Sequence, residues 1–474
     1  MIKFNLFSPF FKWKNPIIRK YSCSNTSGIK ICIVGSGPAG FYSAQQLIKI
    51  SPNVVVDIYE RLPVPFGLVR YGVAPDHADV KNVINTFTKT AKNSNVNFYG
   101  NICLGIDITL QDLINSYHVV LLTYGAEEDR KLNIEGEKLK NVISARRFVG
   151  WYNGLPNDRN LNVDLNGENA VIIGQGNVAI DVARILLSPI DKLKHTDITE
   201  YALEALNGSK VKNVCLIGRR GPLQIACTIK ELREMIKMPG VCTILDRNDF
   251  VEIEKIIPGL GRPRKRLTEL MYNTSIKNDM NNEMNNEKKF QIIFKRTPLE
   301  LLGNGKVEKI RTGVNVLEGE NVETQTAKIT NEIIEIPCDL CLRSIGYKSI
   351  QAEPNIPFDF KKGIIENKNG RILPGLYSSG WVSTGPVGVI LSTMNNAFTT
   401  AQIIQKDIEE KLLDVENGKP GSENILSLVN KKGIQIVRFE DWEKIDREEE
   451  KRGKIKGKPR EKIVTIEEML KIAC

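Results

Sequence analysis

The sequence predicts an α/β protein with two Rossmann-like dinucleotide-binding domains, one of them inserted into the other. Two glycine-rich turns of nearly the same shape lead to this prediction, IVGSGPAG at residues 33–40 and IIGQGNVA at residues 172–179. Each turn follows a β-branched run typical of a buried strand and opens a segment with helical periodicity. A length of 474 residues also favours more than one domain.

The first turn has the G-x-G-x-x-G spacing of a dinucleotide-binding fingerprint. Gly35 permits the tight turn, Gly37 leaves room for a pyrophosphate, and Gly40 lets the helix pack closely on the strand. Phosphates would lie on the free N–H groups at the start of the helix. The next strand, VVVDIYE, ends at Glu60, where a carboxylate can accept hydrogen bonds from ribose hydroxyls. This site should therefore bind an adenine dinucleotide with an unphosphorylated ribose.

The second turn has the same spacing, with Gly174, Gly176 and Ala179, but a different residue pair after the following strand. VKNVCLIGRRGP brings Arg219 and Arg220 to the position where the first site has its acid. Two guanidinium groups suit a 2′-phosphate, so this site should prefer NADP; the alternative is two surface arginines on a loop. Two sites of different ribose preference imply tightly bound FAD in the first and NADPH in the second, with hydride passing between nicotinamide and flavin.

The inserted domain is predicted from two segments that look like an exit from the FAD domain and a return to it. HVVLLTYGAEEDR, at 118–130, is the exit, and CDLCLRSIGYKS, at 338–349, is the return. We therefore predict a targeting presequence at 1–28, a first FAD-binding part at 29–127, an NADP-binding domain at 128–347, and a second FAD-binding part with the C-terminal segment at 348–474.

Two segments fall outside these dinucleotide patterns. Residues 1–28 carry basic side chains and no acid, which is typical of an organelle import presequence; the alternative is a basic segment without a targeting role. Residues 277–289, KNDMNNEMNNEKK, are polar and rich in asparagine, without periodicity. They predict a flexible surface loop.

Composition narrows the partners but does not select one. A net charge of +10 suits nucleic acid, an anionic membrane surface or an acidic protein. The absence of zinc-finger spacing, an aromatic RNA-binding signature and a basic zipper argues against nucleic acid, and we assign no metal ligands. No apolar run reaches the roughly 20 residues that span a bilayer, although peripheral membrane contact stays open. Nine scattered cysteines are typical of reduced, buried thiols in an intracellular enzyme.

One segment goes beyond a generic dinucleotide-binding pattern. YERLPVPFGLVRYGVAPDHADVKNVINTF, residues 59–87, resembles the adrenodoxin reductase family of mitochondrial-type ferredoxin–NADP reductases almost residue for residue. The resemblance continues, in the family's order, in SARRFVGWYNGLP, GQGNVAIDVARILL, GRRGPLQIACTIKELREMI, RPRKRLTEL, SIGYKS, SGWVSTGPVGVI and GKPREK.

The resemblance implies a glutathione-reductase-like architecture and electron transfer from NADPH through FAD to an acidic [2Fe–2S] ferredoxin. A hydride carries two electrons and the ferredoxin accepts one, so the electrons would leave in two single steps. Together with the presequence, the resemblance places the protein in a mitochondrion or a mitochondrion-derived organelle, where it would serve iron–sulfur cluster assembly or a related redox pathway.

The resemblance also implies the residues of each site. FAD would contact Gly35, Gly37, Ala39, Gly40, Glu60, Leu68, Leu104, Trp381, Gly388, Val389 and Ile390. NADP would contact Gly174, Gln175, Gly176, Asn177, Val178, Arg219, Arg220, Glu231 and Gly388. A basic face for the ferredoxin would include Arg233, Arg262 and Arg266.

Several of these roles have a plainer alternative. His77, in APDH, and Asp181, in NVAID, are candidates for a flavin proton relay, but His77 could equally be a loop histidine that only hydrogen-bonds locally. Trp381 could be an ordinary core residue. Basic runs are more often solvated surface than docking sites.

Rival functions are a disulfide reductase and a scaffold that binds both dinucleotides without turnover. Cys338 and Cys341 have the C-x-x-C spacing of redox dithiols. In a strand, side chains three residues apart point to opposite faces, so we interpret this pair as a coincidence of spacing.

Overall fold

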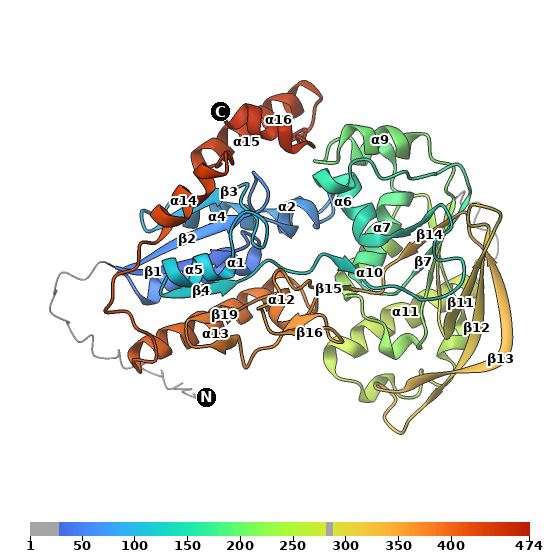
Figure 1. Ribbon diagram of the computed structural model, residues 1–474. Helices are drawn as coiled ribbons and strands as arrows, with labels where there is room; N and C mark the ends of the chain where they lie inside the picture. The colour runs from blue at the N-terminus through green and yellow to red at the C-terminus, as the bar shows by residue number, and fades with distance from the viewer. Residues whose placement is uncertain (1–27, 281–287) are drawn as a thin grey trace, which may run out of the picture.

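The computed structural model describes residues 28–280 and 288–474. It has two lobes side by side, each built on a six-stranded sheet (Figure 1). The predicted presequence lies outside the described residues, apart from Gly28. Within the described ranges, no helix has the length and apolar character needed to cross a membrane.

The first lobe is a doubly wound sheet that the chain enters twice. Its strand order is β18-β19-β4-β1-β2-β3, parallel except for the β18–β19 pair. The strands are β1 (Ile29–Val34), β2 (Val54–Glu60), β3 (Val96–Gly100), β4 (Val119–Leu122), β18 (Arg371–Leu373) and β19 (Leu376–Ser378). The helices are α1 (Pro38–Ile50), α2 (Leu68–Tyr71), α3 (Ala78–Lys81), α4 (Val83–Ala91), α5 (Leu110–Ser116), α12 (Trp381–Thr384) and α13 (Ile390–Glu409). A two-stranded ribbon of β16 (Phe358–Asp359) and β17 (Ile364–Ile365) lies beside α12.

The second lobe has a parallel sheet of order β6-β14-β7-β8-β10-β9. Its strands are β6 (Val142–Ser144), β7 (Asn169–Ile173), β8 (Asn213–Ile217), β9 (Val241–Leu245), β10 (Lys288–Ile293) and β14 (Leu340–Arg343). Its helices are α6 (Ala145–Asn153), α7 (Asn177–Leu187), α8 (Ile190–Leu193), α9 (Glu200–Asn207), α10 (Ile229–Ile236) and α11 (Arg262–Met280), with short 3₁₀ turns η1 (Pro156–Asp158), η2 (Pro222–Gln224), η3 (Arg247–Phe250) and η4 (Ile257–Gly259). An antiparallel sheet of β11 (Arg296–Leu302), β12 (Lys309–Glu318) and β13 (Thr326–Pro337) lies at its outer side (Figure 1).

The segment that leaves the first lobe and the segment that returns to it lie side by side between the lobes. β5 (Glu128–Asp129) pairs antiparallel with β15 (Tyr347–Lys348), and the backbone of the second lobe lies between them in sequence. The predicted boundaries at 127/128 and 347/348 fall beside or within this ribbon. The boundaries themselves stay a prediction.

Three C-terminal helices complete the first lobe. They are α14 (Ser422–Lys431), α15 (Phe439–Ile455) and α16 (Ile466–Ala473). Trp442, Ile445 and Met469 from α15 and α16 are buried in the same apolar cluster as Val56 and Ile58 of β2. The end of the chain is therefore part of the core that begins at residue 29.

The prediction of a flexible loop over 277–289 is wrong at both ends. α11 continues to Met280 and β10 begins at Lys288, whereas 281–287 lie outside the described residues. Leu267 and Met271 of α11 are buried, as are Phe290 and Ile292 of β10. Tertiary packing of these apolar side chains extends the helix and the strand into a segment whose own propensity is weak.

Candidate functional site

The first glycine turn is shaped as the fingerprint predicts. Gly35 has φ +107°, and a Cβ on Gly40 would lie 2.1 Å from the Gly35 carbonyl oxygen. A Cβ on Gly37 would meet nothing within 4 Å, so the turn is open on that side. α1 begins directly after it without a side-chain cap, which leaves its first N–H groups free to bind phosphate.

The carboxylate of Glu60 is fixed beside this turn. Its Oε2 accepts hydrogen bonds from the Ser36 backbone N (2.9 Å) and Oγ (2.8 Å), and its Oε1 accepts one from Leu62 N (3.1 Å). Sequence reasoning missed Ser36, the variable residue of the G-x-G step, because the fingerprint places no requirement on it.

The Trp381 turn lies against the same helix start. A Cβ on Gly380 would come within 2.5 Å of the Cβ of Ala39, and the Gly380 N–H donates to Asn396 Oδ1 (2.7 Å). The Trp381 ring lies 6.0 Å from that of Tyr347, and its buried Nε1–H has no partner among the described residues. A buried donor without a partner is uncommon, and this N–H is available to a bound group.

Apolar side chains after Trp381 are also exposed. Val387 is 74% exposed and Val389 50%, next to the left-handed Gly388 (φ +85°) at the start of α13. Leu68 is 36% exposed, whereas Leu104 is buried in an apolar cluster of the first lobe. An unpaired donor, exposed apolar side chains and an open phosphate turn fit a bound flavin dinucleotide.

The second turn repeats this geometry in the second lobe. Gly174 has φ +129°, a Cβ on Gly176 would meet open space, and α7 starts uncapped. Gln175 donates its Nε2–H to the Ile293 carbonyl (3.1 Å), and Asn177 Oδ1 accepts from Thr228 N (2.8 Å). These side chains hold the turn against β10 and the start of α10 and leave its N–H groups free.

Arg219 and Arg220 follow β8 on a braced but exposed loop. Asn315 Nδ2 donates to the Arg219 carbonyl (2.8 Å), and Lys295 N donates to that of Arg220 (3.1 Å). Both arginine side chains are exposed, and neither forms an ion pair with another described residue. Free guanidinium groups on a fixed backbone fit the 2′-phosphate of NADP.

A cluster of charged side chains joins the two lobes. Arg184 of α7 donates to Asp76 of the first lobe through Nε (2.5 Å) and Nη2 (3.0 Å). Its Nη1 lies 2.8 Å from Asp181 Oδ1 and 3.4 Å from Glu231 Oε2. One buried guanidinium thus holds three carboxylates from both lobes.

His77 belongs to this cluster. Its Nε2 lies 2.8 Å from Glu234 Oε2 and 3.7 Å from Glu231 Oε2, both on α10. The alternative of a histidine that bonds only locally is therefore wrong. His77 and Asp181 share the cluster through Glu231 and Arg184 and have no direct hydrogen bond to each other.

Burial perturbs the acids of this cluster. It raises the pKa of Glu231 to about 7, and the negative charge of Asp181 adds to the effect. Burial also raises the pKa of Asp181, against the opposing charge of Arg184. At neutral pH the cluster can therefore exchange a proton, which suits a relay.

Sequence reasoning predicted His77, Asp181 and Glu231 but missed Asp76, Arg184 and Glu234. The missed residues lie inside the quoted motifs APDH, DVARILL and KELREMI. Their ion pairs cross the lobes, with 108 residues between Asp76 and Arg184, so no local pattern indicates them.

The Cys338/Cys341 pair differs from its prediction. Cys338 follows the end of β13 and is not in the same strand as Cys341, so alternation does not separate the two side chains. The Cys341 thiol hydrogen-bonds that of Cys338 and, with burial, raises the pKa of Cys338 well above its ordinary value. Both thiols are fully buried in a cluster with Val171 and Ile173, away from the apolar clusters of the first lobe. A buried pair in which the Cys338 thiol has a raised pKa does not suit exchange with a disulfide substrate.

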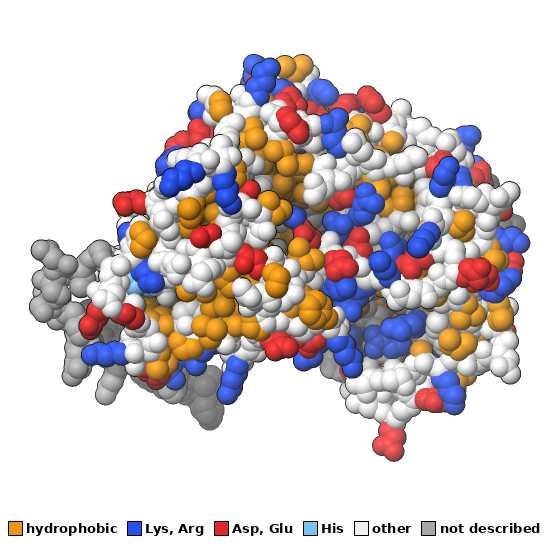
Figure 2. Space-filling model, in the orientation of Figure 1, with side chains coloured by type: hydrophobic (Ala, Val, Ile, Leu, Met, Phe, Trp, Pro, Cys, Tyr) orange, Lys and Arg blue, Asp and Glu red, His pale blue; other side chains and the backbone are white. Residues whose placement is uncertain are grey.

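The predicted docking arginines lie on two neighbouring helices. Arg233 of α10 is half-buried, whereas Arg262 and Arg266 of α11 are exposed. Figure 2 shows Lys and Arg side chains gathered over the region of β15 and α11.

Comparisons with known proteins agree with this geometry. Residues 29–236 match the family described as pyridine nucleotide-disulphide oxidoreductase. The structure resembles that of Mycobacterium tuberculosis FprA in complex with NADPH, with a TM-score of 0.88 and 35% identity over 94% of this chain and 99% of that one.

Two curated relatives are more similar in sequence. The mitochondrial NADPH:adrenodoxin oxidoreductase of Salvelinus fontinalis is 52% identical over 94% of this chain and 91% of its own length. That of Drosophila melanogaster is 52% identical over 95% of this chain and 94% of its own length. On this likeness over nearly its whole length, the chain is an oxidoreductase that belongs to the NADPH:adrenodoxin oxidoreductase family.

Proposed function

We propose that the protein transfers electrons from NADPH to an acidic [2Fe–2S] ferredoxin in the mitochondrion. The observation that carries the proposal is the pair of unlike dinucleotide turns, one with Glu60 and one with two free arginines, in a chain of this family. Bound FAD supplies the chemistry between the partners, because it takes up two electrons together and releases them singly.

The residues around each turn would hold the dinucleotides. FAD fits the turn at 35–40, Glu60, Leu68, Leu104, Trp381 and residues 388–390. NADPH would be held by the turn at 174–178, Arg219 and Arg220, together with Glu231 and Gly388. Domain boundaries at 127/128 and 347/348 belong to this proposal.

The charged cluster between the lobes would move the proton that accompanies electron transfer. His77 Nε2 lies beside Glu234 and Glu231, and the pKa of Glu231, about 7, suits a relay. Asp181 shares Arg184 with Glu231, so a change of charge at one carboxylate alters the proton affinity of the other.

The start of α11 supports a docking face for an acidic partner. Arg262, Arg264, Lys265 and Arg266 stand in its first turns, and no acid balances them in the first turn. Cations at the positive end of a helix dipole destabilise the helix, which a purely structural helix would avoid. With Arg233, they give a basic surface that an acidic ferredoxin complements. Peripheral contact with an anionic membrane is a second use of the same surface and stays a prediction.

The first test is anaerobic mixing of the purified flavoprotein with NADPH or NADH, followed by oxidised [2Fe–2S] ferredoxin. Bleaching of the flavin by NADPH in preference to NADH, then reoxidation as the ferredoxin is reduced, is the expected result. Bleaching without ferredoxin reduction would rule out this partner. A yellow protein that NADPH does not bleach would leave the scaffold alternative.

A further inference from the structure

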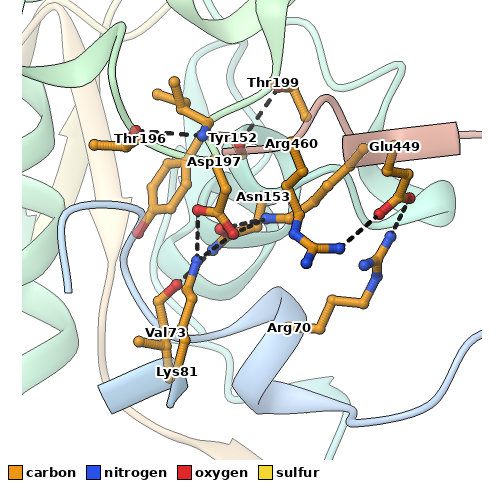
Figure 3. Close-up of polar contacts among 12 residues, drawn as sticks. Arg70, Val73, Lys81, Tyr152, Asn153, Thr196, Asp197, Thr199, Glu449 and Arg460 are labelled. Atoms are coloured by element: carbon orange, nitrogen blue, oxygen red, sulfur yellow. Dashed lines mark hydrogen bonds and ion pairs between the residues drawn. The ribbon is translucent and has the colours of Figure 1, made fainter. Parts of the chain in front are cut away.

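The family motif GKPREK, residues 457–462, has no role in the proposed electron path. It lies between α15 and α16, in residues 456–463, which we call the C-terminal loop. The first lobe holds this loop. Glu449 of α15 binds Arg70 of α2 and Arg460 (3.3 Å), and its Oε1 accepts from Ile463 N (2.9 Å) (Figure 3).

The loop reaches from the first lobe to the second through two buried lysines. Lys458 Nζ donates to the Ile198 carbonyl (2.8 Å). Lys462 Nζ lies 3.1 Å from Asp197 Oδ2 and 3.3 Å from Asn153 Oδ1. Both lysine side chains are 1% exposed, so each depends on protein partners in place of water, which for Lys458 include Glu461 and Glu200.

The two partners of Lys462 also hold the segment that carries His77. Asn153 Nδ2 donates to the Val73 carbonyl (3.2 Å). Asp197 binds Lys81 Nζ through Oδ1 (2.6 Å) and Oδ2 (2.7 Å) (Figure 3). Segment 73–81 is thus tied to the second lobe at both ends, and Lys462 binds the two groups that make the ties.

Stability alone does not account for this arrangement. Lys81 and Lys462 share the one carboxylate of Asp197. Burial, then the charges of Lys81 and Arg70, lower the pKa of Lys462 to about 7. Apolar residues of the same volume usually serve a fold as well as a buried ion pair or better. Unlike an apolar residue, the lysine forms directional hydrogen bonds. Its Nζ–H groups fix the positions of the Asn153 amide and the Asp197 carboxylate.

We propose that Lys462 is a positioning residue that holds segment 73–81, and with it His77, against the second lobe. The inference rests on the proposed function, since segment 73–81 ties together the two lobes that would carry FAD and NADPH, and the alignment of these lobes governs hydride transfer. Lys462 touches neither dinucleotide site directly and acts through Asn153 and Asp197.

Hydrogen–deuterium exchange of the holoenzyme tests the positioning directly. Lys462→Met keeps most of the side-chain volume and removes the donors, and we expect peptides over 73–81 to exchange at least fivefold faster than in the parent. Lys458→Met is the matched control, because Lys458 is equally buried on the same loop but binds neither Asn153 nor Asp197. It should leave exchange over 73–81 unchanged.

Rapid-mixing kinetics give the functional consequence. In Lys462→Met the limiting rate of flavin reduction by NADPH should fall about tenfold, a loss of about 1.4 kcal/mol in transition-state stabilisation. The Kd of NADPH should stay within twofold. If Lys462→Met does not fold, Asn153→Ala should release the Val73 end alone.

The outcomes separate this inference from the proposed function. Equal exchange over 73–81 in parent and Lys462→Met, or equal acceleration in both lysine variants, would overturn the positioning role. A parental protein that NADPH does not bleach would instead overturn the proposed function, whatever the exchange data give.

Discussion

At the scale of single residues, Arg219 and Arg220 determine which nicotinamide dinucleotide binds. A charge-assisted hydrogen bond to phosphate contributes about 1.5–3 kcal/mol. We expect Arg219→Ala and Arg220→Ala each to raise the Kd of NADPH by about 10- to 100-fold and to leave that of NADH unchanged. Lys212→Ala, on an exposed lysine paired with Glu168, is the control. Equal weakening of both dinucleotides would show that the arginines do not read the 2′-phosphate.

Glu231 makes the binding of NADPH depend on pH. Its pKa of about 7 lies above the ordinary value, so the carboxyl is mostly neutral at pH 6 and mostly charged at pH 8. The charged form repels the anionic dinucleotide. The ratio of the Kd at pH 8 to that at pH 6 should therefore be about threefold larger in the parent than in Glu231→Gln. Titration calorimetry at the two pH values measures it, and identical ratios would contradict the assignment.

Residues of the site differ in how far the sequence could predict them. Glycine turns, Glu60 and the two arginines follow strands at fixed spacing, so local pattern predicts them. Asp76 with Arg184, and Lys81 with Asp197 and Lys462, meet only after both lobes have folded. The spacing of these residues in the sequence does not indicate such contacts.

At the scale of elements, α11 combines poor helix electrostatics with a proposed docking role. Arg262→Glu puts an acid at the positive end of the dipole and should stabilise the protein by about 0.5 kcal/mol in urea unfolding. The same change should raise the KM for ferredoxin several-fold and leave NADPH-to-ferricyanide activity intact. Loss of both activities would indicate misfolding. Unchanged KM with higher stability would remove Arg262 from the docking face.

Helices and strands could be predicted where the sequence has a strong apolar periodicity. They could not be predicted where tertiary packing overrides the local propensity of the sequence. β1, β2, β7 and β8 coincide with the β-branched runs beside the glycine turns. α11 and β10 reach into the asparagine-rich segment from buried residues on either side of it, such as Met271 and Phe290. The change of direction between β13 and β14 brings Cys338 to Cys341, which strand alternation alone could not indicate.

At the scale of the whole molecule, the buried contacts of Lys462 between the two lobes make the free energy of unfolding depend on pH. The folded pKa of about 7 lies below the ordinary value of 10.5, with Asp197, Lys81 and Arg70 facing the group. Between these two values the unfolded chain binds more protons, so the contribution of Lys462 to stability rises with pH. Below pH 7 the full penalty of a buried charge remains.

Urea unfolding of the parent and Lys462→Met at pH 6.5 and 9 measures this dependence. Between pH 6.5 and pH 9, the free energy of unfolding should rise by more than about 1 kcal/mol more in the parent than in the variant. A constant difference between the two proteins would mean that Lys462 keeps its charge throughout.

The inserted arrangement has a consequence for the order of assembly. All strands of the second sheet lie between Val142 and Arg343, whereas the first sheet needs β19 and a core that includes α15 and α16. A chain that emerges from a ribosome or an import channel N-terminus first can therefore complete the second lobe before the C-terminal residues of the first lobe have emerged. The turn at residues 35–40 comes first in the sequence, but the lobe around it is completed last. Binding of FAD would therefore mark the last step of folding.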